Sequence, residues 1–184
     1  VEYCSTSNFR FGRLLSELAI DISMFTFIDL GSGKGRVLLM ALEFPFQRVM
    51  GVELSEHLHA IAQKNISTFR GKRRSCQVES VCCDATQFRF PTDPLVVYLF
   101  NPFSRMILER VLQNLMASLN ETPRPVVVIY YNPLHAGVFG AQAGFRECAA
   151  EFSLPRDWNV FVFEQNSLAE NLGNTIYLTA TAAP

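Results

Sequence analysis

Residues 25–35, FTFIDLGSGKG, decide the fold of this chain. The first six residues are mostly apolar and rich in strand formers, so they predict a short buried strand. The glycines that follow permit a sharp turn, and a helical pattern continues to about Phe44, where Pro45 ends it. A strand that leads through a glycine-rich turn into a helix predicts the first unit of a parallel α/β sheet.

The same alternation continues along the rest of the chain. Apolar residues at helical spacing predict helices over 11–18, 55–69 and 104–119. Strand patterns cover 48–53, 77–83, 95–100 and 126–131, weaker ones lie near 145–153 and 158–164, and TIYLTATA from Thr175 is a further candidate. We therefore expect an α/β fold: a three-layer α/β/α sandwich with a doubly wound, mostly parallel sheet of about seven strands and an antiparallel C-terminal hairpin.

Length and composition limit what the chain is. With 184 residues we expect one domain over 1–184, with its core over 25–165. The net charge of −1 gives no bulk attraction for nucleic acid. No apolar run approaches about 20 residues, so we expect no membrane span. The chain starts at Val1 rather than Met, so we expect a fragment or a trimmed chain.

The five cysteines, an odd number, show no C-x-x-C spacing, and the three histidines are not near them in sequence. We therefore expect buried free thiols in a reducing cytoplasm and no metal site.

The glycine turn discriminates between three kinds of ligand. A dinucleotide turn of the form G-x-G-x-x-G requires glycine at position 36, which is Arg36 here. A phosphate-binding G-x-x-x-x-G-K-[ST] spacing does not occur in the chain. S-adenosylmethionine carries no phosphate but does carry an ammonium group, and Asp29 at the end of the strand is placed to pair with that charge. The turn therefore favours S-adenosylmethionine over a nicotinamide dinucleotide.

These residues resemble the class I S-adenosylmethionine-dependent methyltransferase family, whose first motif reads acidic-x-Gly-x-Gly-x-Gly. FIDLGSGKGRV matches that motif completely, and the order of the later elements is similar over roughly residues 25–165. The Asn101-Pro102-Phe103 segment also resembles bacterial members of this family that carry an Asn-Pro-Phe motif. The resemblance implies that residues 1–20 form an N-terminal helix flanking the cofactor site.

The resemblance further implies roles for individual residues. Glu53 would accept hydrogen bonds from the ribose hydroxyls, Asp84 would read the adenine amino group, and Asn101 and Phe103 would position the methyl acceptor as the catalytic pair. The full set expected to bind S-adenosyl-L-methionine is Asp29, Gly31, Ser32, Gly33, Gly35, Glu53, Leu54, Asp84, Ala85 and Asn101. The single proline after Asn101, where amine methyltransferases of this class have two, leaves the target atom open.

The sequence therefore predicts a cytoplasmic methyltransferase. For the unidentified acceptor we expect a protein side chain or a small molecule rather than nucleic acid, because the charge is balanced and no binding module is appended. The basic run from Arg70 to Arg74 is more typical of a solvated loop than of a phosphate-binding surface, and His135 is more typical of a loop histidine than of a base. The alternatives are a catalytically silent interaction domain and an NAD-dependent oxidoreductase.

Overall fold

The centre of the fold is a seven-stranded sheet. The computed structural model describes residues 8–18, 20–75, 77–141, 144–148 and 158–163. The strands are β1 (Thr26–Leu30), β2 (Arg48–Glu53), β3 (Gln77–Cys82), β4 (Leu95–Phe100), β5 (Val126–Tyr131), β6 (Phe145–Glu147) and β7 (Trp158–Phe163). They lie in the order β3-β2-β1-β4-β5-β7-β6, with the first five parallel and β7 antiparallel between β5 and β6. The predicted parallel sheet with an antiparallel C-terminal hairpin is confirmed.

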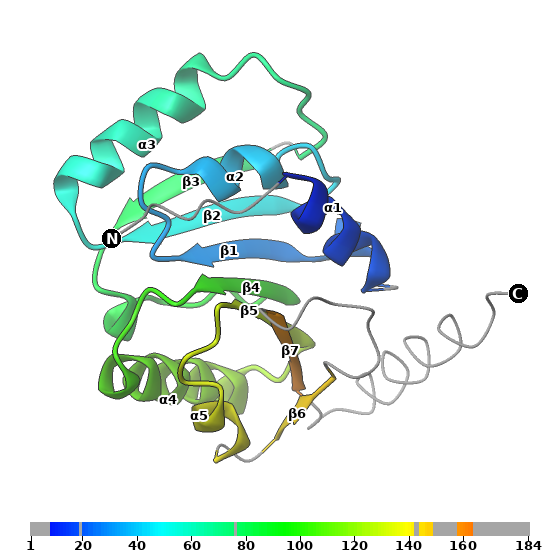
Figure 1. The fold of residues 1–184 in the computed structure, drawn as a ribbon, viewed down its shortest axis with the longest axis vertical. Coiled ribbons are helices and arrows are strands. Elements are labelled where there is room, and N and C mark those ends of the chain that lie inside the picture. The colour runs from blue at the N-terminus through cyan, green and yellow to red at the C-terminus, as the bar shows by residue number, and fades with distance from the viewer. Residues whose placement is uncertain (1–7, 19, 76, 142–143, 149–157, 164–184) are drawn as a thin grey trace, which may run out of the picture.

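Helices cover both faces of this sheet (Figure 1). They are α1 (Asn8–Glu17), α2 (Arg36–Ala41), α3 (Glu56–Thr68), α4 (Arg105–Glu121) and the short α5 (Gly137–Gly140), with single 3-10 turns at Ile22–Met24 and Ala85–Gln87. Apolar side chains of α1 and α2, with parts of α3, pack in one core, whereas those of α4 and α5 pack in a second core on the other face. The predicted three-layer sandwich is therefore confirmed.

The central strands are apolar throughout because both of their faces are covered. Every residue of β1 and β5 is buried, and so is all of β4 except Phe100. Alternate residues of a strand pack in different cores: Phe27 packs in the core with α1 and α2, and Ile28 packs in the core with α4. Burial on both faces explains why these strands read as continuous hydrophobic runs.

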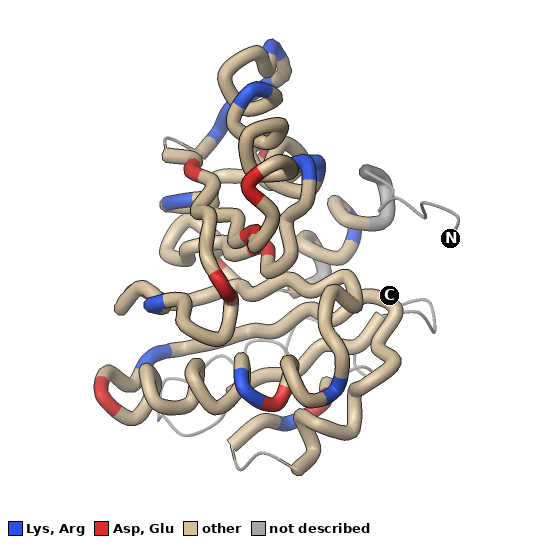
Figure 2. The backbone as a smooth tube through the Cα atoms, turned by 90° about the vertical axis from the view of Figure 1, so that its left-hand side faces the viewer, with Lys and Arg blue, Asp and Glu red and all other residues tan. Residues whose placement is uncertain are grey.

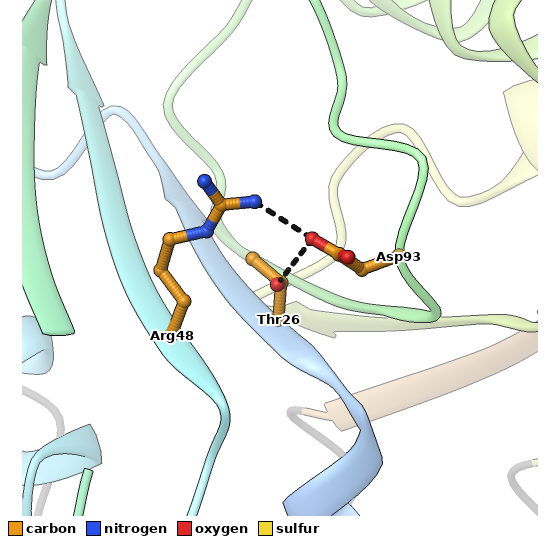
Figure 3. Close-up of polar contacts among 3 residues, drawn as sticks. All are labelled: Thr26, Arg48 and Asp93. Atoms are coloured by element: carbon orange, nitrogen blue, oxygen red, sulfur yellow. Dashed lines mark hydrogen bonds and ion pairs between the residues drawn. The ribbon is translucent and has the colours of Figure 1, made fainter. Parts of the chain in front are cut away.

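A polar cluster fixes the edge of the sheet at which β1 and β2 begin. Asp93 accepts hydrogen bonds from the hydroxyl of Thr26 (3.1 Å) and from the guanidinium of Arg48 (2.7 Å), as Figure 3 shows. Thr26 is fully buried, so the carboxylate satisfies a hydroxyl that has no access to water. The cluster joins the starts of two neighbouring strands to the loop before β4.

The structure departs from the sequence expectations at several ends of elements. The helix after the glycine turn ends at Ala41 and not near Phe44, because residues 42–44 already turn ahead of Pro45. Ser55 caps α3 as predicted, accepting from the N–H of Leu58, but Ser104 precedes α4 without a side-chain cap bond. The strand that begins at Phe145 ends at Glu147; residues 149–153 and the TIYLTATA segment lie outside the described residues.

The thiols are also less uniformly buried than expected. Cys148 is buried, but Cys83 is half-buried and Cys82 is exposed, because β3 is the outermost strand of the parallel part of the sheet. Within the described residues, no helix combines the length and apolarity that crossing a bilayer requires. Over the same residues, no three His, Cys, Asp or Glu side chains gather as metal ligands.

Candidate functional site

The glycine turn lies at the carboxyl ends of β1 and β2. Gly31, Gly33 and Gly35 have φ of +78°, +55° and +78°, the left-handed region that side chains other than glycine rarely adopt. The N–H of Gly31 donates to the carbonyl of Val52 at 2.8 Å, so the turn folds back over β2. A Cβ on Gly31 would lie 2.4 Å from Pro102, whereas a Cβ on Gly33 would meet nothing within 4 Å. Gly33 therefore lies against open space, as the turn of a ligand-binding loop requires.

Glu53 connects this turn to the loop after β2. Its Oε2 accepts from the N–H of Gly33 at 2.8 Å, and its Oε1 accepts from the N–H of Ser55 at 2.9 Å. The side chain is buried, so these charge-assisted bonds are shielded from water. Glu53 thus holds the shape of the turn in addition to the binding role expected from sequence.

A cavity of about 530 Å³ opens between these loops and the start of α4. Seven residues singled out from the sequence lie in its wall: Gly31, Gly33, Glu53, Leu54, Asp84, Ala85 and Phe103. The other wall residues were not predicted: Val52, Leu58, Cys83, Pro102, Ser104 and Ile107. Leu58 and Ile107 lie in the first turns of α3 and α4. Each helix starts soon after a strand ends, so an apolar residue on the inward face of its first turn was the sequence signal that could have identified them. The wall combines apolar side chains with the carboxylates of Glu53 and Asp84, a composition suited to a flat heterocycle with attached hydroxyls.

Four residues of the predicted set lie outside this wall. Gly35 begins α2 and packs against Ala62 of α3, where a Cβ would come within 3.1 Å. Ser32 is buried above Gly51 of β2, and its hydroxyl has no hydrogen-bond partner among the described residues. Asn101 directly precedes the wall residue Pro102, and Asp29 lies two residues before Gly31, but neither lines the cavity itself.

Asp29 is a buried carboxyl group directly beneath the turn. It lies opposite Gly51 in the pairing of β1 and β2, and its side chain is 3% exposed. Burial, with a further contribution from the negative charge of Glu53, raises the pKa of Asp29 to about 8. In the free protein at neutral pH this carboxyl is therefore mostly protonated, and a nearby cation would favour its ionised form.

Asp84 follows β3 and begins the 3-10 turn Ala85–Gln87. Its carboxylate accepts from the N–H of Thr86 at 2.8 Å, and hydrogen bonds from Thr86 lower the pKa of Asp84 below its ordinary value. The carboxylate is therefore ionised at neutral pH and fixed in position at the edge of the cavity. Asp84 thus accepts the hydrogen bond that begins the 3-10 turn and lines the cavity at the same time.

Two similar loops follow β4 and β5. Asn101 and Asn132 each end a strand, adopt positive φ (43° and 50°) and precede a proline. The hydroxyl of Tyr130, in β5, donates to Oδ1 of Asn101 at 2.9 Å. Burial raises the pKa of Tyr130, and a backbone hydrogen bond from His135 opposes this. Tyr130, which the sequence presents only as a buried strand aromatic, therefore connects the two loops.

The basic run lies away from this cavity. A second hollow of about 590 Å³ is lined by residues that include Arg48 and Gln77, the first residues of β2 and β3, and by Arg73. It therefore lies at the opposite edge of the sheet from the glycine turn. Lys and Arg residues gather around α3 and the loop after it, in the upper part of Figure 2. Arg70, Lys72, Arg73 and Arg74 are exposed there, as expected of a solvated loop.

The fold and the site together define a Rossmann-like α/β domain with a cavity at the carboxyl edge of its sheet. A family model described as a methyltransferase domain matches residues 27–122. The chain belongs to this family and is an S-adenosylmethionine-dependent methyltransferase. A search of curated proteins found no match.

Solved structures with the same fold have low sequence identity to the chain. A SAM-dependent methyltransferase from Aquifex aeolicus has a TM-score of 0.60 at 15% identity, covering 83% of this chain and 87% of its own. An RNA methyltransferase from Salinibacter ruber, in complex with S-adenosyl-L-homocysteine, has a TM-score of 0.58 at 21% identity, covering 89% of this chain and 95% of its own. A ribosomal protein L11 methylase from Lactobacillus delbrueckii subsp. bulgaricus has a TM-score of 0.56 at 14% identity, covering 83% of this chain and 77% of its own. The expectation that nucleic acid is disfavoured as acceptor is not supported, because this fold serves an RNA methyltransferase as well as a protein methylase.

Proposed function

We propose that the cavity beside the glycine turn binds S-adenosylmethionine, and that the loops after β4 and β5 receive the methyl acceptor. The observation that carries the proposal is the Glu53 carboxylate in the cavity wall, bonded at 2.8 Å to the N–H of Gly33. This hydrogen bond joins Gly33, which has open space beside it, to a carboxylate that is able to accept from ribose hydroxyls. When bound, the cofactor supplies an electrophilic methyl group.

The remaining wall residues fit the other parts of this cofactor. Leu54, Leu58, Ile107 and Phe103 offer an apolar slot for the adenine ring, and the fixed carboxylate of Asp84 is an acceptor for its exocyclic amino group. The buried Asp29 is the group suited to the ammonium of the methionyl part. We assign these roles to the chain's own residues, together with Gly31, Gly33 and Ala85 in the wall.

The acceptor side is formed by the carboxyl ends of β4 and β5. Phe103 reaches the cavity wall, and Asn101 precedes it by two residues. Leu134 and Met106 belong to the loop after β5 and to the first turn of α4, and they are 68% and 61% exposed. Such exposed apolar side chains near a cofactor site suit contact with the face of an acceptor group. A protein side chain, a small molecule and RNA all remain acceptors that this surface is able to take.

Titration calorimetry of the domain with S-adenosylmethionine, S-adenosylhomocysteine and NAD tests the proposal. We expect micromolar binding of the first two and no binding of NAD. Binding of NAD alone would establish the oxidoreductase reading, and no binding of any of them at millimolar ligand would overturn the cofactor assignment. A catalytically silent domain would bind the cofactor and transfer no tritium label from it to the RNA, protein or small molecules of a cell extract.

Replacing Glu53 with alanine should weaken cofactor binding by roughly 2–3 kcal/mol, since hydrogen bonds to a buried carboxylate are lost. By the conversion of 1.4 kcal/mol per factor of ten, this is a loss of about 30- to 150-fold. Glu53→Gln should not rescue binding, because both oxygens of Glu53 accept from N–H groups and a carboxamide accepts with only one. Calorimetry of both variants beside Glu56→Gln, a change at an exposed neighbour, measures the effect. Unchanged affinity in Glu53→Ala would remove Glu53 from the site.

A further inference from the structure

The side chain of Asn101 is held in one orientation by a partner from the next strand. Leu99 lies opposite Tyr130 in the pairing of β4 and β5, which places the phenol beside the end of β4. The phenol is 1% exposed, so its hydroxyl depends on protein partners. Those partners are Oδ1 of Asn101, at 2.9 Å, and the backbone of His135.

The chemistry of the phenol decides which end of the Asn101 carboxamide faces it. A phenol oxygen has one hydrogen to donate, and the N–H of His135 is already a donor to that oxygen. If the Nδ2 group of Asn101 also pointed at the phenol, three donors would meet and the buried hydroxyl hydrogen would lack an acceptor. The carboxamide oxygen must therefore face Tyr130.

The Nδ2 group is then directed away from Tyr130. It makes no hydrogen bond with any described residue, and it is not among the described polar atoms that are both shut off from solvent and unpaired. It is therefore an accessible donor on the loop whose next residues, Pro102 and Phe103, form the cavity wall. The left-handed φ of 43° at Asn101 holds this geometry at the end of β4.

We propose that Tyr130 is a positioning residue that turns the Asn101 carboxamide so that it meets the methyl acceptor as a hydrogen-bond donor. This rests on the proposed function for the choice of site. It follows that the acceptor molecule presents an oxygen or nitrogen lone pair, such as a carbonyl or a ring nitrogen, beside the atom that is methylated. The oxygen of Asn101 already accepts from the phenol, so Nδ2 is the group of this carboxamide that is left without a partner among the described residues.

Nuclear magnetic resonance of the free, labelled domain tests the orientation without any cofactor. We expect the Nδ2 hydrogens of Asn101 to show no cross-peak to the ring of Tyr130, and the Asn101 side-chain signals to shift in Tyr130→Phe. Tyr131→Phe is the matched control, because Tyr131 is the adjacent residue on the opposite face of β5 and stacks on Trp158. A strong cross-peak, or signals that Tyr130→Phe leaves unmoved, would overturn the proposal.

Transfer of tritiated methyl groups from S-adenosylmethionine to the RNA, protein and small-molecule fractions of a cell extract gives the second readout. Tyr130→Phe should lower the rate by about five- to tenfold, the worth of one hydrogen bond, with the Kd for S-adenosylhomocysteine unchanged. Asn101→Asp keeps an acceptor but no donor, so it should lose activity as fully as Asn101→Gly, which tolerates the positive φ. Activity retained in Asn101→Asp would contradict a donor role. If the wild type labels none of these fractions, the proposed function fails, while the resonance experiment still decides the orientation.

Discussion

Gly33→Arg is expected to abolish detectable cofactor binding, a loss of at least about 100-fold. The reason is that a Cβ on Gly33 meets nothing within 4 Å, so the new side chain would extend into the space beside the turn. That space adjoins the carboxylate of Glu53, with which the guanidinium would pair as a competitor for the cofactor. Each factor of ten in affinity corresponds to about 1.4 kcal/mol, so the loss of two charge-assisted hydrogen bonds between the cofactor and Glu53 would account for about 100-fold.

The controls for this variant separate blockage from backbone strain. Gly33 has φ of +55°, so any side chain there costs roughly 1–2 kcal/mol of folding stability. Gly33→Ala carries that strain without filling the cavity, and it should retain most of the affinity in calorimetry. Gly140→Arg adds the same side chain at an exposed glycine that also has open space around it, and it should bind as the wild type does. Equal affinity in Gly33→Arg and Gly33→Ala would show that the cofactor does not occupy the space beside Gly33.

Several residues that the sequence singled out line one cavity, because the signals that identify them are local. The three glycines and Asp29 lie within seven consecutive residues, and Glu53 and Asp84 each end a strand whose pattern is plain. Parallel strands bring their carboxyl ends to one edge, so the residues that follow them necessarily meet there. Hence Gly31, Gly33, Glu53 and Asp84 surround one cavity, as the order of elements implied.

The contact between the loops after β4 and β5 could not be predicted in the same way, because it depends on registry between distant segments. Tyr130 and Asn101 are separated by 29 positions, and only the pairing of β4 with β5 brings them together. Pattern analysis assigns Tyr130 to the core, which is correct for its ring and says nothing of its hydroxyl. The bond from Gly33 to Glu53 could not be predicted for the same reason, since it requires the turn to fold back over β2.

Asp29→Asn should stabilise the free domain above pH 4, and by more as the pH rises. Burial raises the pKa of Asp29 to about 8, whereas in the unfolded chain it is near 3.9. Between these values the native state holds a proton that the unfolded state releases, so the free energy of unfolding falls as the pH rises. The favourable contribution is fully present below about pH 4 and is lost as the pH passes 8, with a slope of up to about 1.4 kcal/mol per unit. Asparagine imitates the protonated carboxyl and does not titrate.

Urea unfolding at pH 5, 6, 7 and 8 measures this difference directly. The gap between Asp29→Asn and the wild type should widen steadily over the series, whereas the exposed change Glu56→Gln should follow the wild type throughout. A gap that is constant with pH would mean that Asp29 is already ionised in the native state. In that case hydrogen-bond donors at the strand ends would have to stabilise the Asp29 charge against repulsion by Glu53.

The cofactor should reverse the sign of this effect. If Asp29 pairs with the ammonium of S-adenosylmethionine, binding requires its ionised form and must release the proton, so affinity should rise from pH 6 to pH 8. Asp29→Asn should bind weakly with a flat pH profile, although it is the more stable protein. A residue that lowers the stability of the free domain and contributes favourably only when the cofactor binds is typical of a functional site. Affinity with the same pH dependence in both proteins would assign Asp29 a purely structural place beneath the turn.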